Sequence, residues 1–252
     1  MNDVPLKLRS APIVEAVLDI DCDLPPNPDL AALKALAEKH LHDTYPVVRE
    51  RFIQETQVEA KTGEAPKVST RQGLLALQFL AGDEKQLVQL RPQGYSFNRL
   101  APYSSLDDYL PEIERTWNLF VQIIGPLQVR VIRLRFINRI LLPTVNGSVN
   151  LEDYLKLGPR LPDEENLTFT GFFTQQSAME PATGNAVNTT MATQPIEADK
   201  LPIILDIEAH YAGNIEPTDW PQLASRIQSL RRLKNLVFKN SLTEPCLNLF
   251  QH

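Results

Sequence analysis

Two stretches of alternating sequence decide the expected fold: IVEAVLDIDCDL at residues 13–24 and VIRLRFINRI at residues 131–140. In both stretches apolar residues recur at every second position, which is the pattern of a β-strand with one buried face. The polar positions carry opposite charges, with Glu15, Asp19, Asp21 and Asp23 in the first stretch and Arg133, Arg135 and Arg139 in the second. Because each stretch opens one half of the chain, the two strands predict a sheet with a polar surface along its middle.

The two halves show the same order of elements: a strand, a helix, several antiparallel strands and a long helix. In the first half we expect a helix behind an Asn27 cap, strands at 50–60, 74–80, 86–91 and 95–100, a loop at 61–72, and a helix at 106–124 behind a Ser104–Asp107 capping box. In the second half we expect a turn at 142–150, a short helix at 151–157, a hairpin of strands 167–179 and 187–196, a strand at 201–211 and a helix from near Thr218.

This order predicts an α+β fold built from tandem duplicated units, each running strand, helix, antiparallel strands, helix. We expect the half-repeats to span residues 1–126 and 127–252. The simplest arrangement is one compact domain, in which a single curved antiparallel sheet carries the helices on one face. The opposite face of that sheet is then open.

Composition limits the classes of function. The chain has 252 residues and a net charge of −6, which disfavours general affinity for nucleic acid or for an anionic membrane. Two cysteines are too few for a disulfide framework and suit a reducing compartment. The start of the chain lacks the apolar stretch of a signal peptide, and no apolar run approaches the roughly 20 residues of a membrane span. We therefore expect a cytoplasmic protein without membrane contact.

Basic and aromatic residues form the first candidate binding site. Its members lie on the strand at 131–140 and on the neighbouring hairpin, and they are Arg91, Tyr95, Phe97, Arg99, Arg133, Arg135 and Arg139. Guanidinium groups beside stacking aromatic rings could bind a small anionic ligand, a nucleotide or single-stranded nucleic acid. In the other interpretation the arginines pair with the acidic residues of the strand at 13–24 and stabilise the fold. We favour this second interpretation, because ion pairs are common in such patterns.

Acidic residues form a second candidate site, for a metal ion. Its members are Asp19, Asp21, Asp206, Glu208 and His210, on two strands. Converging carboxylates can hold Mg²⁺ or Mn²⁺ for phosphoryl chemistry. Solvated strand faces carry such residues routinely, and the chain lacks the glycine-rich and histidine motifs of known metal and phosphate sites. We expect no cofactor.

Three blocks of sequence carry a resemblance to a known family. They are APIVEAVLDI at 11–20, QLRPQGYSFNRL at 89–100 with Pro102-Tyr103 just after, and RLRFINRI at 133–140. In this order and spacing the chain resembles a sporadically distributed family of uncharacterised bacterial proteins of about this length. The resemblance covers nearly the whole chain and implies no activity, cofactor or catalytic residue. The scattered occurrence of the family is typical of accessory or genome-defence genes.

These observations favour a non-enzymatic binding or interaction protein over an enzyme. The chain contains only 10 glycines and no recognisable set of nucleophile and base. We expect its binding surface to be the open sheet face or the cleft between the halves, and its partner to be a protein or a small anionic ligand. A homo-oligomer is compatible with this view. The alternative is a metal-dependent enzyme that acts on a nucleotide or nucleic acid.

Overall fold

The computed structural model describes residues 8–26, 30–59, 67–160, 162, 166–167 and 169–251. Their strands form one nine-stranded antiparallel sheet in the order β2-β3-β4-β5-β1-β6-β9-β8-β7. The strands are β1 (Ile13–Asp23), β2 (Val47–Glu59), β3 (Lys67–Leu80), β4 (Gln86–Arg91), β5 (Gly94–Leu100), β6 (Gln128–Pro143), β7 (Phe173–Glu180), β8 (Asn185–Thr193) and β9 (Lys200–Ile215). The helices are α1 (Leu30–Leu41), α2 (Leu106–Ile124), α3 (Trp220–Ser241) and α4 (Glu244–Asn248), and a 3₁₀ turn spans Leu151–Asp153. The expected α+β class with an antiparallel sheet is confirmed.

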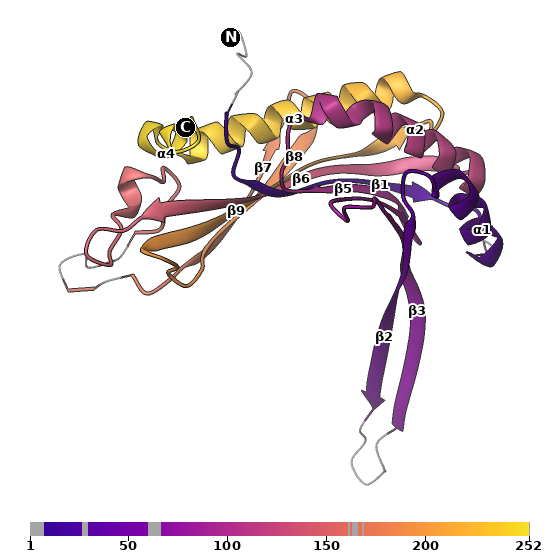
Figure 1. Ribbon diagram of the computed structural model, residues 1–252, viewed down its shortest axis with the longest axis horizontal. Coiled ribbons are helices and arrows are strands. Elements are labelled where there is room, and N and C mark those ends of the chain that lie inside the picture. Colours follow the sequence, from indigo (N-terminus) through magenta and orange to yellow (C-terminus); the bar gives the residue numbers. More distant parts are fainter. Residues whose placement is uncertain are drawn as a thin grey trace.

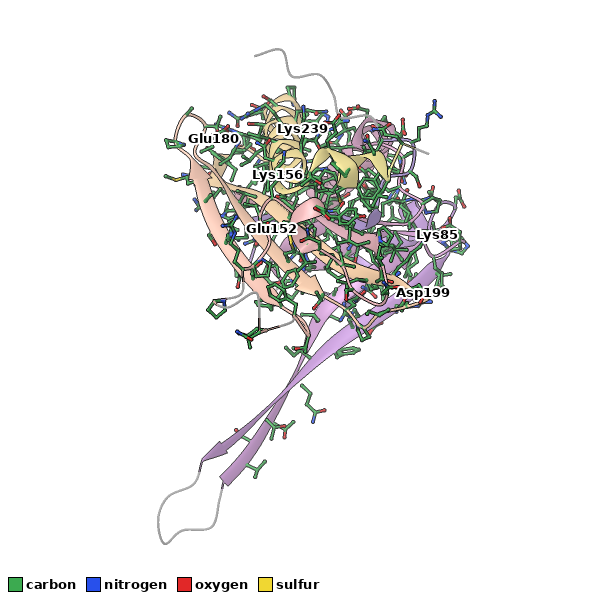
Figure 2. The ribbon with its side chains drawn as sticks, turned by 90° about the vertical axis from the view of Figure 1, so that its left-hand side faces the viewer. Lys85, Glu152, Lys156, Glu180, Asp199 and Lys239 are labelled. Atoms are coloured by element: carbon green, nitrogen blue, oxygen red, sulfur yellow. The ribbon has the colours of Figure 1, made fainter. Side chains whose placement is uncertain are left out.

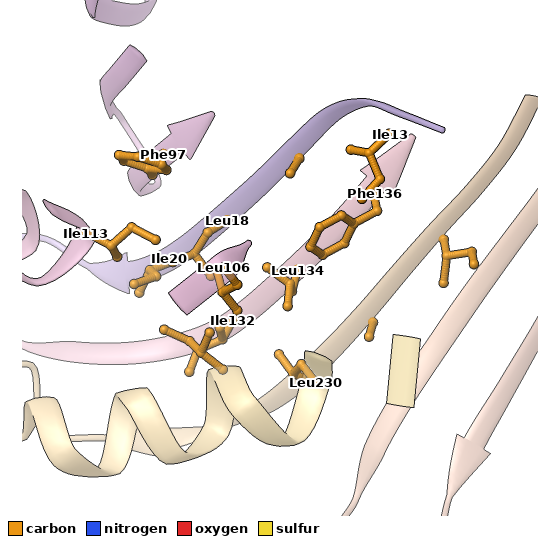
Figure 3. Packing of buried hydrophobic residues seen from close by; sticks show 14 of the residues in the cluster. Ile13, Leu18, Ile20, Phe97, Leu106, Ile113, Ile132, Leu134, Phe136 and Leu230 are labelled. Atoms are coloured by element: carbon orange, nitrogen blue, oxygen red, sulfur yellow. The ribbon is translucent and has the colours of Figure 1, made fainter. Parts of the chain in front are cut away.

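The helices lie along one face of the sheet, and the other face is left open (Figure 1). The core fills the space between the helices and the sheet. Side chains from the central strands β1 and β6, such as Ile20 and Ile132, pack there against Ile113 of α2 and Leu230 of α3 (Figure 3). None of the described helices is long and apolar enough to cross a membrane.

The two halves of the chain meet at the pairing of β1 with β6. Leu18 lies opposite Leu134, and Asp19 lies opposite Arg133. The sheet is therefore continuous across the expected boundary between residues 126 and 127. Alternation along the strands places the leucines on the helix-covered face and the charged residues on the open face.

Helix α2 shows how local chemistry fixes an element. Its N-cap is Ser105 rather than Ser104, because the Ser105 hydroxyl accepts a hydrogen bond of 3.2 Å from the Asp107 N–H. Pro111 lies inside the helix without ending it. Gly125 ends it in a left-handed conformation at φ 64°, and its N–H donates to the Val121 carbonyl at 2.9 Å.

Several expected boundaries were wrong. Residues 67–72 belong to β3 and not to a loop, and the short helix expected at 151–157 is only a 3₁₀ turn. Strand β6 continues through residues 142–143 and strand β9 through residues 212–215, beyond their expected ends. Helix α4 was not predicted. The Asn27 cap and the loop at 60–66 lie outside the described residues. For residues 67–72 alternation was a weak guide, because the described side chains of that segment are exposed.

Lys234 of α3 is a buried cation in the helix layer. Its side chain is 8% exposed, and its ammonium lies 3.9 Å from the centre of the Phe136 ring. Burial, with a smaller contribution from the nearby Arg231 charge, lowers the pKa of Lys234 to about 7. The attraction between the ammonium and the aromatic ring compensates only part of the hydration free energy that the ammonium loses on burial.

We expect Lys234→Met to stabilise the protein most below pH 7, by on the order of 3 kcal/mol in the free energy of unfolding. Below pH 7 both the folded and unfolded wild-type chains carry the Lys234 proton, and the folded chain bears the whole cost of burial. Between pH 7 and about 10 only the unfolded chain keeps that proton, so wild-type stability gains on the variant as pH rises. Denaturant melts across this range measure the difference. Lys239→Met, at an exposed position of the same helix, is the control and should change little; a pH-independent difference for Lys234→Met would contradict the expectation.

Candidate binding surface

The open face of the sheet carries a network of ion pairs at its centre. Asp21 of β1 accepts a hydrogen bond from Arg133 of β6 and another, at 2.9 Å, from Arg91 of β4. The Arg91 guanidinium also lies 3.4 Å from the Asp19 carboxylate, and Asp19 accepts from the Ser96 hydroxyl. Four strands are thus joined through two carboxylates.

Two further arginines of β6, Arg135 and Arg139, pair with the opposite side of the sheet. The Nε of Arg135 donates to the Asp206 carboxylate of β9 at 2.9 Å. Arg139 binds Glu197 at 2.5 Å and the Gln194 side chain at 3.1 Å. Hydrogen bonding to Asp206 raises the pKa of Arg135. We expected Arg135 to pair with the acidic strand β1; it binds β9 because β6 has an acidic neighbour on both sides.

A second set of polar contacts crosses the sheet beside the ion pairs. The Gln78 side-chain amide donates to the Gln89 side chain at 2.8 Å, and Gln89 donates to Asn98 at 2.8 Å. Asn98 in turn donates to the Glu15 carboxylate at 2.9 Å. This chain of amides connects β3, β4, β5 and β1. These contacts were not predicted from the sequence, because isolated amide residues on separate strands form no recognisable pattern until the pairing register of the strands is known.

The structure does not bring the expected aromatic residues to the open face. Tyr95 is fully buried on the helix-covered face, where its hydroxyl shares a 2.7 Å hydrogen bond with Thr116 of α2. Phe97 is buried beside Tyr109, and the Arg99 guanidinium lies 5.5 Å from the centre of the Tyr109 ring. These three residues of β5 share one face, and β5 pairs with buried positions of β1. The expectation that they extend an arginine patch was therefore wrong.

The acidic residues of the candidate metal site fall into two separate groups. Asp19 and Asp21 are on β1, whereas Asp206, Glu208 and His210 are on β9, and β6 lies between the two strands. Two strand spacings amount to roughly 10 Å, too far for one ion to bridge. Glu208 and His210 lie 3.8 Å apart, between Oε1 and Nδ1. Among the described residues, no three His, Cys, Asp or Glu side chains are close enough to hold a metal ion.

The cysteine of the central strand is no candidate nucleophile. Cys22 packs against the core, and burial raises the pKa of its thiol to about 12. The thiol is the unreactive form, because the thiolate is the nucleophile.

A hollow of about 930 Å³ lies beside the Arg139 end of β6, and its lining includes Gln194, which accepts a hydrogen bond from Arg139. Its lining includes Leu151, Phe169 and Ile196. Residues 161, 163–165 and 168, which fall within or beside its lining segments, lie outside the description.

The chain matches no family model and no curated protein. The resemblance to a bacterial family consequently stays a prediction.

We expect the Arg133–Asp21 pair to be worth about 1 kcal/mol of coupling energy, because both side chains are less than a third exposed. A double-mutant cycle of Arg133→Gln and Asp21→Asn, followed by denaturant melts, measures this energy. The matched control is the Arg130–Asp23 pair, whose side chains are 48% and 45% exposed and whose coupling should be near zero. Equal couplings for the two pairs would show that the central network adds nothing special to stability.

Proposed function

We propose that this protein is a non-enzymatic binding module, whose partner contacts the open face of the sheet and the projecting end of the β2–β3 hairpin. We call this projecting end the arm; it comprises residues 52–59 of β2 and 67–74 of β3. The arm is the observation that carries the proposal. It extends away from the sheet on the side opposite the helices (Figures 1 and 2), and only residues 77–80 of β3 pair with β4.

The arm contributes little to the core of its own chain. Phe52 is 53% exposed and Val68 is 64% exposed. A two-stranded hairpin without a third layer is marginally stable in water, and apolar side chains at its surface gain from being covered. A partner that lies against the arm would supply that cover.

The arm projects from the sheet on the same side as the open face (Figures 1 and 2). Phe52 lies opposite Leu74, which packs against the helix-covered core. Ile53, 45% exposed on the other side of the arm, has the parity of Arg49, which lies opposite Gln78 of the open face. A β-bulge between Arg51 and Phe52 interrupts the register where the arm begins. Bulges bend a strand and increase its twist, which accounts for the change of direction.

The charges of this surface favour a protein partner. Arg133, Arg135 and Arg139 are each bound to a carboxylate of the same chain, so a phosphate or small anion would have to displace those partners. Phe52, Gln54, Thr56 and Thr70, which share one side of the arm, are uncharged. Nucleic acid would need unpaired cations here, and the metal-dependent enzyme draws no support from two acidic groups held on separate strands.

We also infer that the fold arose by tandem duplication. Outward from the centre, the first half runs β1-β5-β4-β3-β2 and the second runs β6-β9-β8-β7. In both halves the first strand is central, the last strand lies next to it, and the others follow in reverse order. This shared order supports two half-repeats related by an approximate two-fold axis between β1 and β6.

A photo-crosslinking amino acid in place of Phe52 tests the proposed function in the native host. We expect a discrete adduct that survives nuclease and disappears with protease, because the arm should lie against a protein. The same amino acid in place of Leu236, which is 46% exposed on α3, is the control and should give no such adduct. Equal labelling at both positions, or a nuclease-sensitive adduct at Phe52, would contradict a protein partner on the arm.

A further inference from the structure

The two edges of the sheet differ in how they are protected against pairing with another chain. Edge strands present unpaired N–H and C=O groups, and proteins guard them with charged residues, proline or bulges. The edge strand β2 carries Arg49, Glu50 and Arg51 near its bulge. The edge strand β7 has the sequence FTQQSAME, in which the single charge, Glu180, is at the last position. Glu180 binds Arg232 of α3 at 2.5 Å. Strand β7 therefore has one charged residue, at its end, where β2 has five along its length.

Strand β7 is also exposed along most of its length. Phe173 and Met179, near its two ends, are 68% and 65% exposed. Both lie opposite residues of β8 on the open face, Ala192 and Ala186. None of the described strands pairs with the outer edge of β7, and Figure 2 shows Glu180 at the margin of the molecule.

We propose that β7 pairs with β7 of a second copy of this chain, antiparallel and about a two-fold axis, with Gln176 of one copy opposite Gln176 of the other. The pairing would join two nine-stranded sheets into one continuous sheet with both open faces on the same side.

The register follows from backbone geometry and from the two apolar residues. In an antiparallel pair, two directly opposite residues both turn their N–H and C=O groups toward the partner strand or both turn them away from it. Because this orientation alternates along a strand, a strand that pairs with its own copy places each residue opposite one of the same parity. With Gln176 at the centre, Phe173 of each copy meets Met179 of the other, and a thioether beside an aromatic ring is a favourable contact. With Ser177 at the centre, Phe173 would be left outside and Thr174 would face Glu180.

The occupant is a second copy because the edge complements itself. The Gln176-centred register places no charge opposite a like charge, covers both exposed apolar residues in each copy and pairs two amides at its centre. A strand pair of this length buries less than the roughly 1,000 Å² of a stable interface. We therefore expect a weak, reversible dimer.

Sedimentation of the full chain from about 1 µM to about 1 mM tests the dimer, and denaturant melts verify that each variant is folded. We expect the wild type to associate, Phe173→Lys to weaken association at least tenfold, and Phe173→Lys with Met179→Glu to restore it, since only the Gln176-centred register sets these positions opposite each other. Phe52→Lys, on the other edge strand, is the control and should associate like wild type. A wild type that stays monomeric throughout, an unchanged Phe173→Lys or an unrestored double variant would overturn the proposal.

Cysteine cross-linking reads the register directly. Opposite Cα atoms in an antiparallel pair lie about 4.5–5.5 Å apart, within reach of a disulfide. We expect Gln176→Cys to form a disulfide-linked dimer on oxidation, and Ser177→Cys, one position away, to form far less. A cross-link at Ser177→Cys and none at Gln176→Cys would overturn the proposed register, and the proposal with it.

Discussion

The pairing of β1 with β6 is the contact on which the rest of the structure depends. Strands β2 to β5 reach the centre of the sheet through β1, and strands β7 to β9 reach it through β6. Each face of this pair has its own chemistry. On the covered face Leu18 and Leu134 lie opposite each other beneath the helices, and on the open face Arg133 binds Asp21. Hydrophobic burial supplies most of the stabilisation. The half-exposed ion pairs add little free energy, but they favour one register of the paired strands.

Sequence reasoning was accurate where one face of an element is buried continuously. The alternation of residues 13–24 and 131–140 predicted both central strands, and the apolar spacing of residues 106–124 predicted α2. It was wrong for residues 67–72 of β3, because the arm is exposed on its described sides and its polar residues read as a loop. Helix α4 is a single short turn around the buried Cys246, too brief to show a period.

The candidate site was harder to predict than the fold, because its contacts cross strands. Arg133 binds Asp21, which lies two residues along β1 from its direct neighbour Asp19, and Arg135 binds Asp206 of β9. Tyr95 and Arg91 are close in sequence, yet the turn between β4 and β5 sends them to opposite faces of the sheet. The sequence indicates which residues of a strand share a face, but the contacts of each side chain with neighbouring strands depend on the pairing register.

The opposite signs of the two central strands have a consequence for recognition between chains. If β1 of one molecule met β1 of another, Asp19 and Asp21 would face their own counterparts, and two copies of β6 would set arginine against arginine. Like charges directly across a ladder repel, so each central strand rejects its own kind and accepts the other. The β1–β6 pairing thereby discriminates against association of like halves of two chains during folding, a form of specificity that the net charge of the chain does not reveal.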